Sequence, residues 1–145
     1  MKKIKNIYIR TVNWGDCDPA GIVFYPNFYK WMDEAHWLFF EQIGLSIVNL
    51  KKKYKIVGLP LIKTSAIYYI PCKQGDQLEI EIRLIELKNS SLKLQHIIKK
   101  NKKVASIGFE SRVWAKKEGD IVAPEQIPSA VRNKLINFVK DEEII

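Results

Sequence analysis

Hydrophobic and polar residues follow two different periods along the chain, and each change of period predicts a new element. Residues 4–13 alternate between the two classes, which predicts a strand. Residues 27–43 carry apolar side chains at helical spacing around most of their circumference, which is typical of a helix buried on several sides. Pro26 precedes this helix, Asn27 can cap its start and Gly44 can end it.

After residue 57 the pattern is that of β-strands. Four segments show it: residues 58–70, 77–88, 91–100 and 103–116. The alternation slips near Ile85, which predicts a bulge. Residues 45–54 are predicted to form a short helical segment, and residues 127–140 an amphipathic helix that begins near Pro128. A strand, a long apolar helix and then four strands are an α+β order, in which an antiparallel sheet curls around the helix.

Length and composition predict one globular domain that spans residues 1–145. Hydrophobic residues make up 47% of the chain, so a folded core needs neither a metal nor a disulfide. No apolar run approaches the roughly 20 residues of a membrane helix, and the N-terminus lacks the apolar region of a signal peptide. Cys17 and Cys72 are too few for a disulfide framework and are not spaced as zinc ligands. These features predict a cytoplasmic protein without a metal site.

Residues 14–27, with the sequence WGDCDPAGIVFYPN, carry the candidate chemistry. Asp16 and Asp18 are two apart, so in an extended backbone both carboxylates face one side, toward a cleft, while Cys17 faces away. Aspartates are also common in turns, where they bond their own backbone. A metal pair would need a third ligand nearby, and a nucleophilic Cys17 would need a base that this segment lacks. The residues alone leave a carboxylate active site and a structural turn both open.

The longer segment WGDCDPAGIVFYPNFYKWMDEA closely resembles the active-site segment of the 4-hydroxybenzoyl-CoA thioesterase family. The resemblance continues in VGLP at residues 57–60 and GDQLEIEIR at residues 75–83, and most of residues 8–115 can be aligned. It implies the hotdog fold, in which a five-stranded antiparallel sheet wraps around a long central helix. It also implies active sites at subunit interfaces, with pairs of sheets joined into one in a homodimer or homotetramer.

The resemblance implies a role for each matching residue. Asp18 is the catalytic carboxylate, which attacks the thioester carbonyl or activates a water that does so. The backbone N–H of Tyr25 polarises the carbonyl oxygen, and a side-chain mutation would not remove this donor. Gly21 is expected to allow close approach of the substrate, with a simple turn glycine as the alternative. Phe24 is expected to contact the substrate, although an aromatic pocket need not mean an aromatic acyl group.

Two positions depart from the family pattern. Where the family has a basic run that meets the nucleotide of coenzyme A, this chain has Lys88-Asn89-Ser90, so only Lys88 keeps the charge. Leu59 replaces a threonine, which changes the expected polarity of the pocket. The net charge of +8 is either solvated surface or an attraction for an anionic partner such as coenzyme A. Much of it lies in lysine runs at residues 2–3, 51–53, 99–100, 102–103 and 116–117.

These expectations predict an acyl-CoA thioesterase that needs no cofactor. The alternative is a hotdog module that binds an acyl-CoA or an acyl carrier protein without hydrolysing the thioester. Nucleic-acid binding rests only on the net charge, since no recognition motif accompanies it, so neither nucleic acid nor membrane is a predicted partner. Two polar residues are given structural roles: Asp16 is expected to bond loop amides, and His36 to pack on the helix beside Trp37. The alternative for His36 is a role in lining the acyl pocket.

Overall fold

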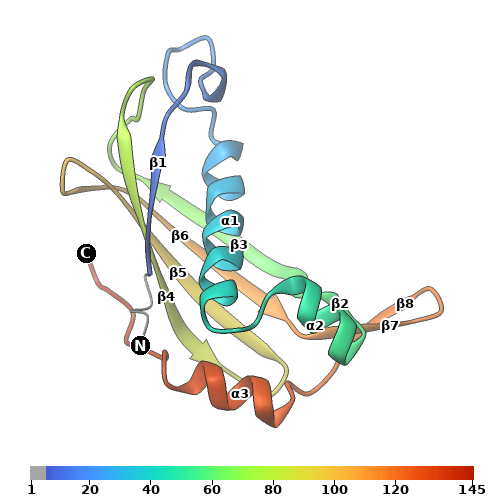
Figure 1. The fold of residues 1–145 in the computed structure, drawn as a ribbon. Coiled ribbons are helices and arrows are strands. Elements are labelled where there is room, and N and C mark those ends of the chain that lie inside the picture. The colour runs from blue at the N-terminus through green and yellow to red at the C-terminus, as the bar shows by residue number, and fades with distance from the viewer. Residues whose placement is uncertain (1–5) are drawn as a thin grey trace.

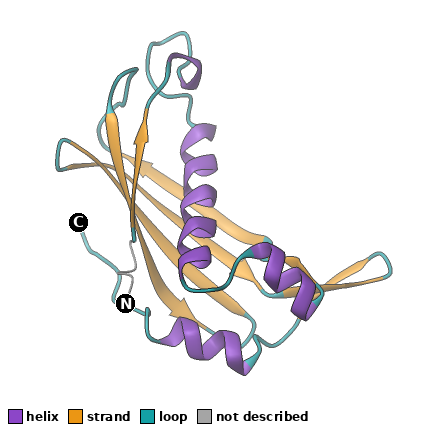
Figure 2. Ribbon diagram, viewed as in Figure 1, coloured by secondary structure: helices purple, strands orange, loops and turns teal. Residues whose placement is uncertain are grey.

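The computed structural model describes residues 6–145 and confirms the predicted α+β fold. Five strands form the main sheet in the order β1-β4-β5-β6-β3, with every neighbouring pair antiparallel. They are β1 (Ile7–Thr11), β4 (Gln77–Leu87), β5 (Ser91–Lys100), β6 (Lys103–Val113) and β3 (Leu61–Tyr68). The long helix α1 (Pro26–Gln42) lies across one face of this twisted sheet (Figures 1 and 2). Residues 4 and 5 of the first predicted strand lie outside the described residues.

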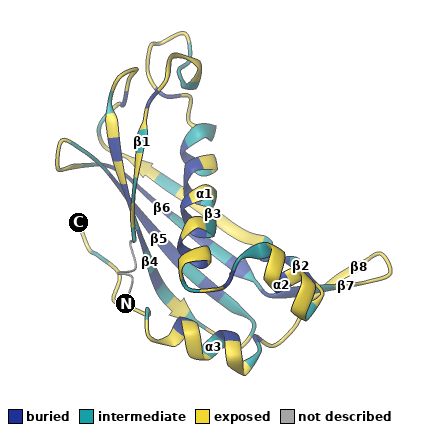
Figure 3. Ribbon diagram, viewed as in Figure 1, coloured by how far each residue is buried: buried dark blue, intermediate teal, exposed yellow. Residues whose placement is uncertain are grey.

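Helix α1 is buried along the face that it turns to the sheet (Figure 3), whereas its apolar pattern predicted burial on several sides; Leu38, on the outer face, is 45% exposed. Its buried residues are Phe28, Trp31, Met32, Ala35, His36, Phe39 and Phe40. Phe40 packs in one core cluster, and Trp31 packs in a second that also holds Val23 and Cys72. Burial of each such apolar side chain stabilises the fold by roughly 1.5–3 kcal/mol. Among residues 6–145, neither α1 nor any other helix is long and apolar enough to cross a membrane.

The ends of α1 lie within one residue of the prediction, but the helix starts differently. It begins at Pro26 with Tyr25 at the N-cap position, so the prediction that Asn27 caps the helix is wrong. Proline suits the first helical position because the N–H that it lacks would have no partner there. Gly44 follows the helix with a φ of +78° and ends it as predicted.

A second sheet of three strands, which the pattern did not predict, extends beyond the main sheet (Figure 1). Its strands, in order, are β2 (Ile56–Gly58), β7 (Ala115–Glu118) and β8 (Ile121–Pro124). The predicted strands 58–70 and 103–116 therefore each divide between the two sheets. The second division falls at Trp114, whose side chain is only 1% exposed and packs against the ring of Tyr54.

The two short helices occur where they were predicted, but the second is shorter. Helix α2 spans Ile47–Tyr54, and helix α3 spans Ser129–Ile136. The chain does not continue as a helix to residue 140 because it joins the sheet. The Lys140 N–H donates to the carbonyl of Leu84 at 2.9 Å, and Val139 forms a β-bridge with the same residue.

Two local features shape the main sheet, and the first of them was predicted. The register of β4 against β5 shifts between Leu84 and Glu86, which is the bulge predicted near Ile85. Asn101 and Lys102 form the turn between β5 and β6, with φ angles of +50° and +64°. Positive φ at both central residues is typical of a tight two-residue hairpin turn.

Candidate active site

The loop before α1 is held by its own backbone, and this sets the position of Asp18. The Asp18 N–H donates to the carbonyl of Ile22, and the Gly21 N–H donates to the carbonyl of Asp18, each at 2.9 Å. Gly21 has a φ of +79°, which glycine adopts without strain, so the turn itself requires this glycine. The Val23 N–H donates to the carbonyl of Cys72 at 2.8 Å and ties the loop to the segment before β4.

The Asp18 carboxylate is half-buried and takes part in the same turn. Its Oδ1 accepts a hydrogen bond from the Ala20 N–H at 2.8 Å, which is the backbone contact that aspartate commonly makes in turns. Its Oδ2 has no hydrogen-bond partner within residues 6–145. The turn therefore orients the carboxylate while using only one of its two oxygens.

Asp16 has the structural role that was expected of it. Its Oδ2 accepts from the Asn13 N–H at 2.8 Å, and its Oδ1 lies 3.7 Å from the Arg10 guanidinium. The prediction that Asp16 and Asp18 face one cleft is wrong, because the Asp16 carboxylate bonds the Asn13 N–H within a short 3₁₀ turn at residues 14–16 and lines neither pocket that Asp18 lines. The rule that residues two apart share one side of the chain does not apply to such a turn. The prediction that Cys17 faces away from Asp18 is also wrong, because both residues line one pocket.

The start of α1 offers a hydrogen-bond donor beside the loop. The Phe24 N–H donates to the carbonyl of Asp16, whereas the Tyr25 N–H has no acceptor within the described residues. The side-chain amide of Asn27 donates to the same carbonyl of Asp16 at 2.8 Å, so it holds the loop to the helix instead of capping it. Because a helix N-terminus carries a partial positive charge, the Tyr25 N–H is suited to a carbonyl oxygen that gains negative charge.

Asp18 lies at the boundary of two pockets. The aromatic pocket, of about 430 Å³, is lined by Asp18, Ile22, Val23, Tyr25, Phe28, Tyr68, Tyr69, Ile70, Pro71 and Cys72. The outer pocket, of about 580 Å³, is lined by Trp14, Gly15, Cys17, Asp18, Pro19, Gly21 and Gln74. An acyl group in the aromatic pocket could therefore place its carbonyl beside Asp18 and leave the thiol part in the outer pocket.

The aromatic pocket is built by the loop before α1, by Phe28 of α1, and by the end of β3 with the segment that follows it. The rings of Phe28 and Tyr68 lie 5.2 Å apart between centroids. Burial and a hydrogen bond with Tyr29 raise the pKa of Tyr68, so its hydroxyl stays protonated. Burial also raises the pKa of the Cys72 thiol, which makes it a poor nucleophile. No group of three or more His, Cys, Asp or Glu side chains in the described part of the chain is placed to hold a metal ion.

One chain brings together only part of the predicted site. Gly21 lines the outer pocket. Phe24 is 48% exposed, packs edge to face on the ring of Tyr25 and lines neither pocket. Lys88 follows the last residue of β4, at the end of the sheet opposite the Asp18 loop, and its ammonium lies 3.6 Å from Glu86. Lys88 therefore does not approach Asp18 within a single chain.

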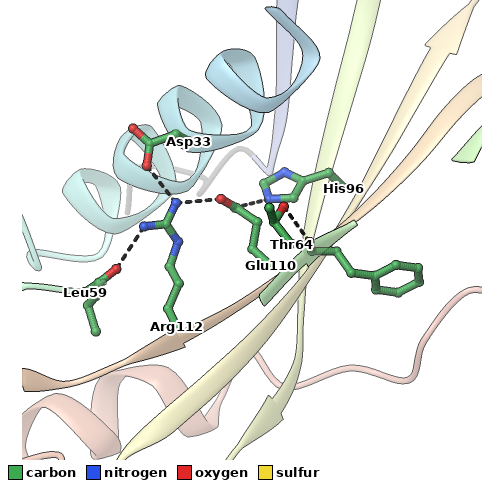
Figure 4. A network of polar contacts seen from close by, with 7 residues as sticks. Asp33, Leu59, Thr64, His96, Glu110 and Arg112 are labelled. Atoms are coloured by element: carbon green, nitrogen blue, oxygen red, sulfur yellow. Dashed lines mark hydrogen bonds and ion pairs between the residues drawn. The ribbon is translucent and has the colours of Figure 1, made fainter. Parts of the chain in front are cut away.

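A buried polar network between α1 and the sheet was not predicted (Figure 4). Arg112 donates to Glu110 at 2.5 Å, to Asp33 on α1 at 2.6 Å and to the carbonyl of Leu59 at 3.0 Å. His96 Nε2 lies 2.6 Å from the other oxygen of Glu110. Burial alone would raise the pKa of Glu110, but the bond to His96 and the charge of Arg112 outweigh it and hold the pKa below its usual value. The network ties β5, β6 and α1 to the segment that connects β2 with β3.

The sequence carried one signal of this network. Glu110 and Arg112 occupy alternate positions of a predicted strand, which places two charges on one face of it. That face is the one turned to α1, where unpaired charges would be costly. Leu59 is 3% exposed and lines neither pocket, so its replacement of a threonine does not alter the pockets of a single chain.

Comparison with known proteins shows the family to which this chain belongs. The sequence model of the thioesterase-like superfamily matches residues 12–135. The chain belongs to this superfamily. A relative, the 4-hydroxybenzoyl-CoA thioesterase of Pseudomonas sp. (strain CBS-3), is 28% identical over 126 residues, which are 83% of this chain and 89% of the relative.

Two solved structures of thioesterases are similar to this member of the superfamily. A gentisyl-coenzyme A thioesterase is 39% identical, with a TM-score of 0.78 over 90% of this chain and 99% of that chain. A mutant 4-hydroxybenzoyl-CoA thioesterase in complex with 4-hydroxybenzoyl-CoA is 26% identical, with a TM-score of 0.83 over 88% of this chain and 96% of that chain. These similarities confirm the family resemblance and the hotdog fold. The protein is a thioester hydrolase.

Proposed function

We propose that this thioesterase hydrolyses acyl-CoA, with Asp18 as the catalytic carboxylate and the Tyr25 N–H as the donor to the thioester oxygen. One observation carries the proposal: Asp18 lines both pockets, and Tyr25, whose N–H has no acceptor within residues 6–145, lines one of them. The similar enzyme in complex with its acyl-CoA is an aspartate-to-asparagine mutant, which supports an aspartate as the catalytic group.

In the proposed reaction the acyl group occupies the aromatic pocket. Oδ2 of Asp18 either attacks the thioester carbon or takes a proton from a water that attacks it. The carbonyl oxygen becomes negative and accepts a hydrogen bond from the Tyr25 N–H, a contact typically worth about 10²–10³ in rate. The C–S bond then breaks, and coenzyme A leaves as a thiolate that takes up a proton. In the first route, water hydrolyses the anhydride formed on Asp18 and restores the carboxylate.

We expect an aromatic acyl group as the substrate. Phe28, Tyr68 and Tyr69 line the pocket, where flat rings can pack edge to face or offset. Two similar enzymes are named for gentisyl and 4-hydroxybenzoyl thioesters, which supports the same class here. The protonated hydroxyl of Tyr68 is suited to a polar substituent on such a ring.

We further propose that two copies pair through β3 to join their sheets. β3 is an edge strand, and seven of its eight residues are exposed. They include Leu61, Ile62 and Ile67, at 47%, 62% and 53% exposure, and an unpaired apolar edge favours strand pairing. Antiparallel pairing would set the partner's Leu61 against the Tyr68 end of β3, beside the aromatic pocket. The partner's Lys88 would then lie on the side of this pocket, about 14 Å from the joined edge.

The test is release of free thiol from a panel of short, long and aromatic acyl-CoAs. Wild-type protein is expected to hydrolyse at least one of them. Asp18→Asn removes the nucleophile or base and is expected to lower kcat/KM by roughly 10²–10⁴-fold. Asp16→Asn is the matched control, because it makes the same chemical change in a residue that lines neither pocket.

The outcomes separate the alternatives. Asp16→Asn is expected to keep most of kcat and to lower the melting temperature, since Asp16 bonds the Asn13 N–H. Full activity of Asp18→Asn would reject the role given to Asp18. Tight binding of acyl-CoA by wild-type protein without turnover of any panel member would favour the non-catalytic binding module.

A further inference from the structure

A lysine-rich hairpin lies at the same end of the main sheet as the Asp18 loop. Lys100, the last residue of β5, pairs with Leu78 near the start of β4. The segment just before β4 is bonded to the end of β1, since the Val12 N–H donates to the carbonyl of Asp76 at 2.8 Å. The β5–β6 hairpin and the Asp18 loop therefore extend from the same end of the sheet (Figure 1).

This hairpin contacts the segment that lines both pockets. The Lys100 ammonium lies 2.6 Å from Asp76 Oδ2 and 3.4 Å from the carbonyl of Pro71. Pro71 and Cys72 line the aromatic pocket, and Gln74 lines the outer pocket. Burial alone would raise the pKa of Asp76, but the bond to Lys100 and the Lys73 N–H outweigh it and lower the pKa. The ion pair therefore fixes the hairpin relative to the pockets.

The charges on this surface do not cancel. Lys100 is paired with Asp76, and Lys99 lies opposite Glu79 in the register of β5 against β4. Lys102 and Lys103 are exposed and have no ion-pair partner among residues 6–145. The tip of the hairpin thus presents two uncompensated positive charges beside the segment that lines the pockets. We call these two residues the hairpin lysines.

Lys102 has a backbone conformation that lysine rarely adopts. Its φ of +64° is in the left-handed region, which disfavours a side chain with a Cβ. The preferred pair in such a two-residue hairpin turn is Asn-Gly, and here Asn101 is followed by lysine instead of glycine. A residue kept in a sparsely populated conformation is a reason to look for a function of its side chain.

We propose that the hairpin lysines bind the phosphates of the coenzyme A nucleotide, while the thioester lies at Asp18. This inference rests on the proposed acyl-CoA thioesterase function. Coenzyme A carries its phosphates at the end remote from the sulfur, so they need a basic surface outside the pockets. Lysine ammonium groups bind phosphate as point charges. The hairpin lysines supply within one chain the charge that the site lacks when only Lys88 remains of the family's basic run.

The experiment compares acyl-CoA with the matching acyl-pantetheine, which has the same thioester but no nucleotide. Lys102→Gly/Lys103→Ala removes two charges and is expected to raise KM for acyl-CoA about tenfold, with kcat unchanged. KM for acyl-pantetheine is expected to stay the same. Lys51→Ala/Lys52→Ala, on exposed positions of α2, makes the same change in net charge and should alter neither KM.

Folding and binding are separated in the same variants. Glycine at position 102 suits the left-handed backbone, so Lys102→Gly is expected not to lower the melting temperature. Binding of coenzyme A, measured by titration calorimetry, should weaken about tenfold in the hairpin variant and stay unchanged in the α2 control. If wild-type protein hydrolyses no acyl-CoA but the hairpin variant still binds coenzyme A more weakly, the proposed reaction is rejected and the hairpin site is not.

Three results would overturn the proposal. One is an equal rise of KM for acyl-CoA and for acyl-pantetheine in the hairpin variant, which would mean that the lysines do not bind the nucleotide. Another is an equal loss of coenzyme A binding in the α2 control, which would make the effect one of net charge. The third is slower hydrolysis of an acylated carrier protein by the hairpin variant while its binding of coenzyme A is unchanged, which would assign the surface to a protein partner.

Discussion

His36 illustrates at the scale of one residue how burial controls a charge. Its side chain is fully buried on α1, with its ring 4.3 Å from that of Trp37 and 4.4 Å from that of Phe40 between centroids. The expectation that it packs on the helix beside Trp37 is confirmed. Neither of its ring nitrogens has a partner within residues 6–145. Burial, the charge of Arg112 and that of His96 all lower its pKa well below the ordinary 6.5.

A neutral His36 makes the fold sensitive to mild acid. The unfolded chain takes up a proton near pH 6.5 that the folded chain does not, so stability is fully present above pH 6.5 and falls below it. The expected loss is about 1.4 kcal/mol per pH unit. His36→Phe removes this dependence, which urea unfolding at pH 7 and pH 5 would measure. An identical loss in wild-type and variant proteins between these pH values would contradict the prediction.

At the scale of elements, the contact between α1 and β6 is unusually close. A Cβ built on Gly108 would lie 2.0 Å from the Sδ of Met32 and 2.9 Å from its Cε. Met32 is 1% exposed and cannot move aside into solvent. Glycine at this position of β6 thus allows the helix to rest on the sheet, close to the buried network of Arg112, which joins the same two elements.

Gly108→Ala is therefore expected to destabilise the protein by about 1–3 kcal/mol, because the added methyl overpacks the core. Met32→Ala creates space at the same contact, so in the double variant the two effects should add to less than their sum. Chemical denaturation of the four proteins measures this coupling. Gly15→Ala is the control, since nothing lies within 4 Å of a Cβ there. Full additivity would show that the two residues do not compete for space.

At the scale of the whole molecule, a single chain leaves the apolar edge strand β3 of the main sheet exposed to solvent. β1 and β3 form the two edges, and β3 is the one that ends at the aromatic pocket, through Tyr68. Assembly through β3 would thus both cover an apolar edge and enclose the pocket. The oligomeric state and the activity are coupled in this proposal.

Ile67→Lys places a charge on this edge and is expected to shift the protein toward monomer and to lower kcat/KM together. Lysine on an edge strand opposes pairing because its charge would be buried in the joined sheet. Analytical ultracentrifugation and the thiol-release assay provide the two readouts. Ile121→Lys, on the exposed strand β8, is the matched control and should change neither. A variant that stays dimeric would argue against pairing through β3.

The sequence pattern was enough to predict the elements whose formation depends only on which side chains are buried and which are exposed to water. The period of residues 27–43 predicted α1, and the alternation near Ile85 predicted the bulge, because both depend on which side chains leave water. The segment around Asp18 likewise carried the family and its reaction. Local periodicity is thus enough to specify a helix, a strand and their order.

Only the tertiary structure decided how distant residues orient one another. The Asp16 carboxylate lies apart from the pockets because residues 14–16 form a 3₁₀ turn in which it accepts a hydrogen bond from the Asn13 N–H. The alternation of side chains along a strand does not predict such a turn. Arg112 meets Asp33 of α1, and Glu110 meets His96 of β5, across separations that leave no periodic signal. The two pockets at Asp18 also need β3 and the segment before β4, which reach the loop only when the sheet has formed. Periodicity records burial from water, whereas a site depends on contacts between segments that are far apart in the chain.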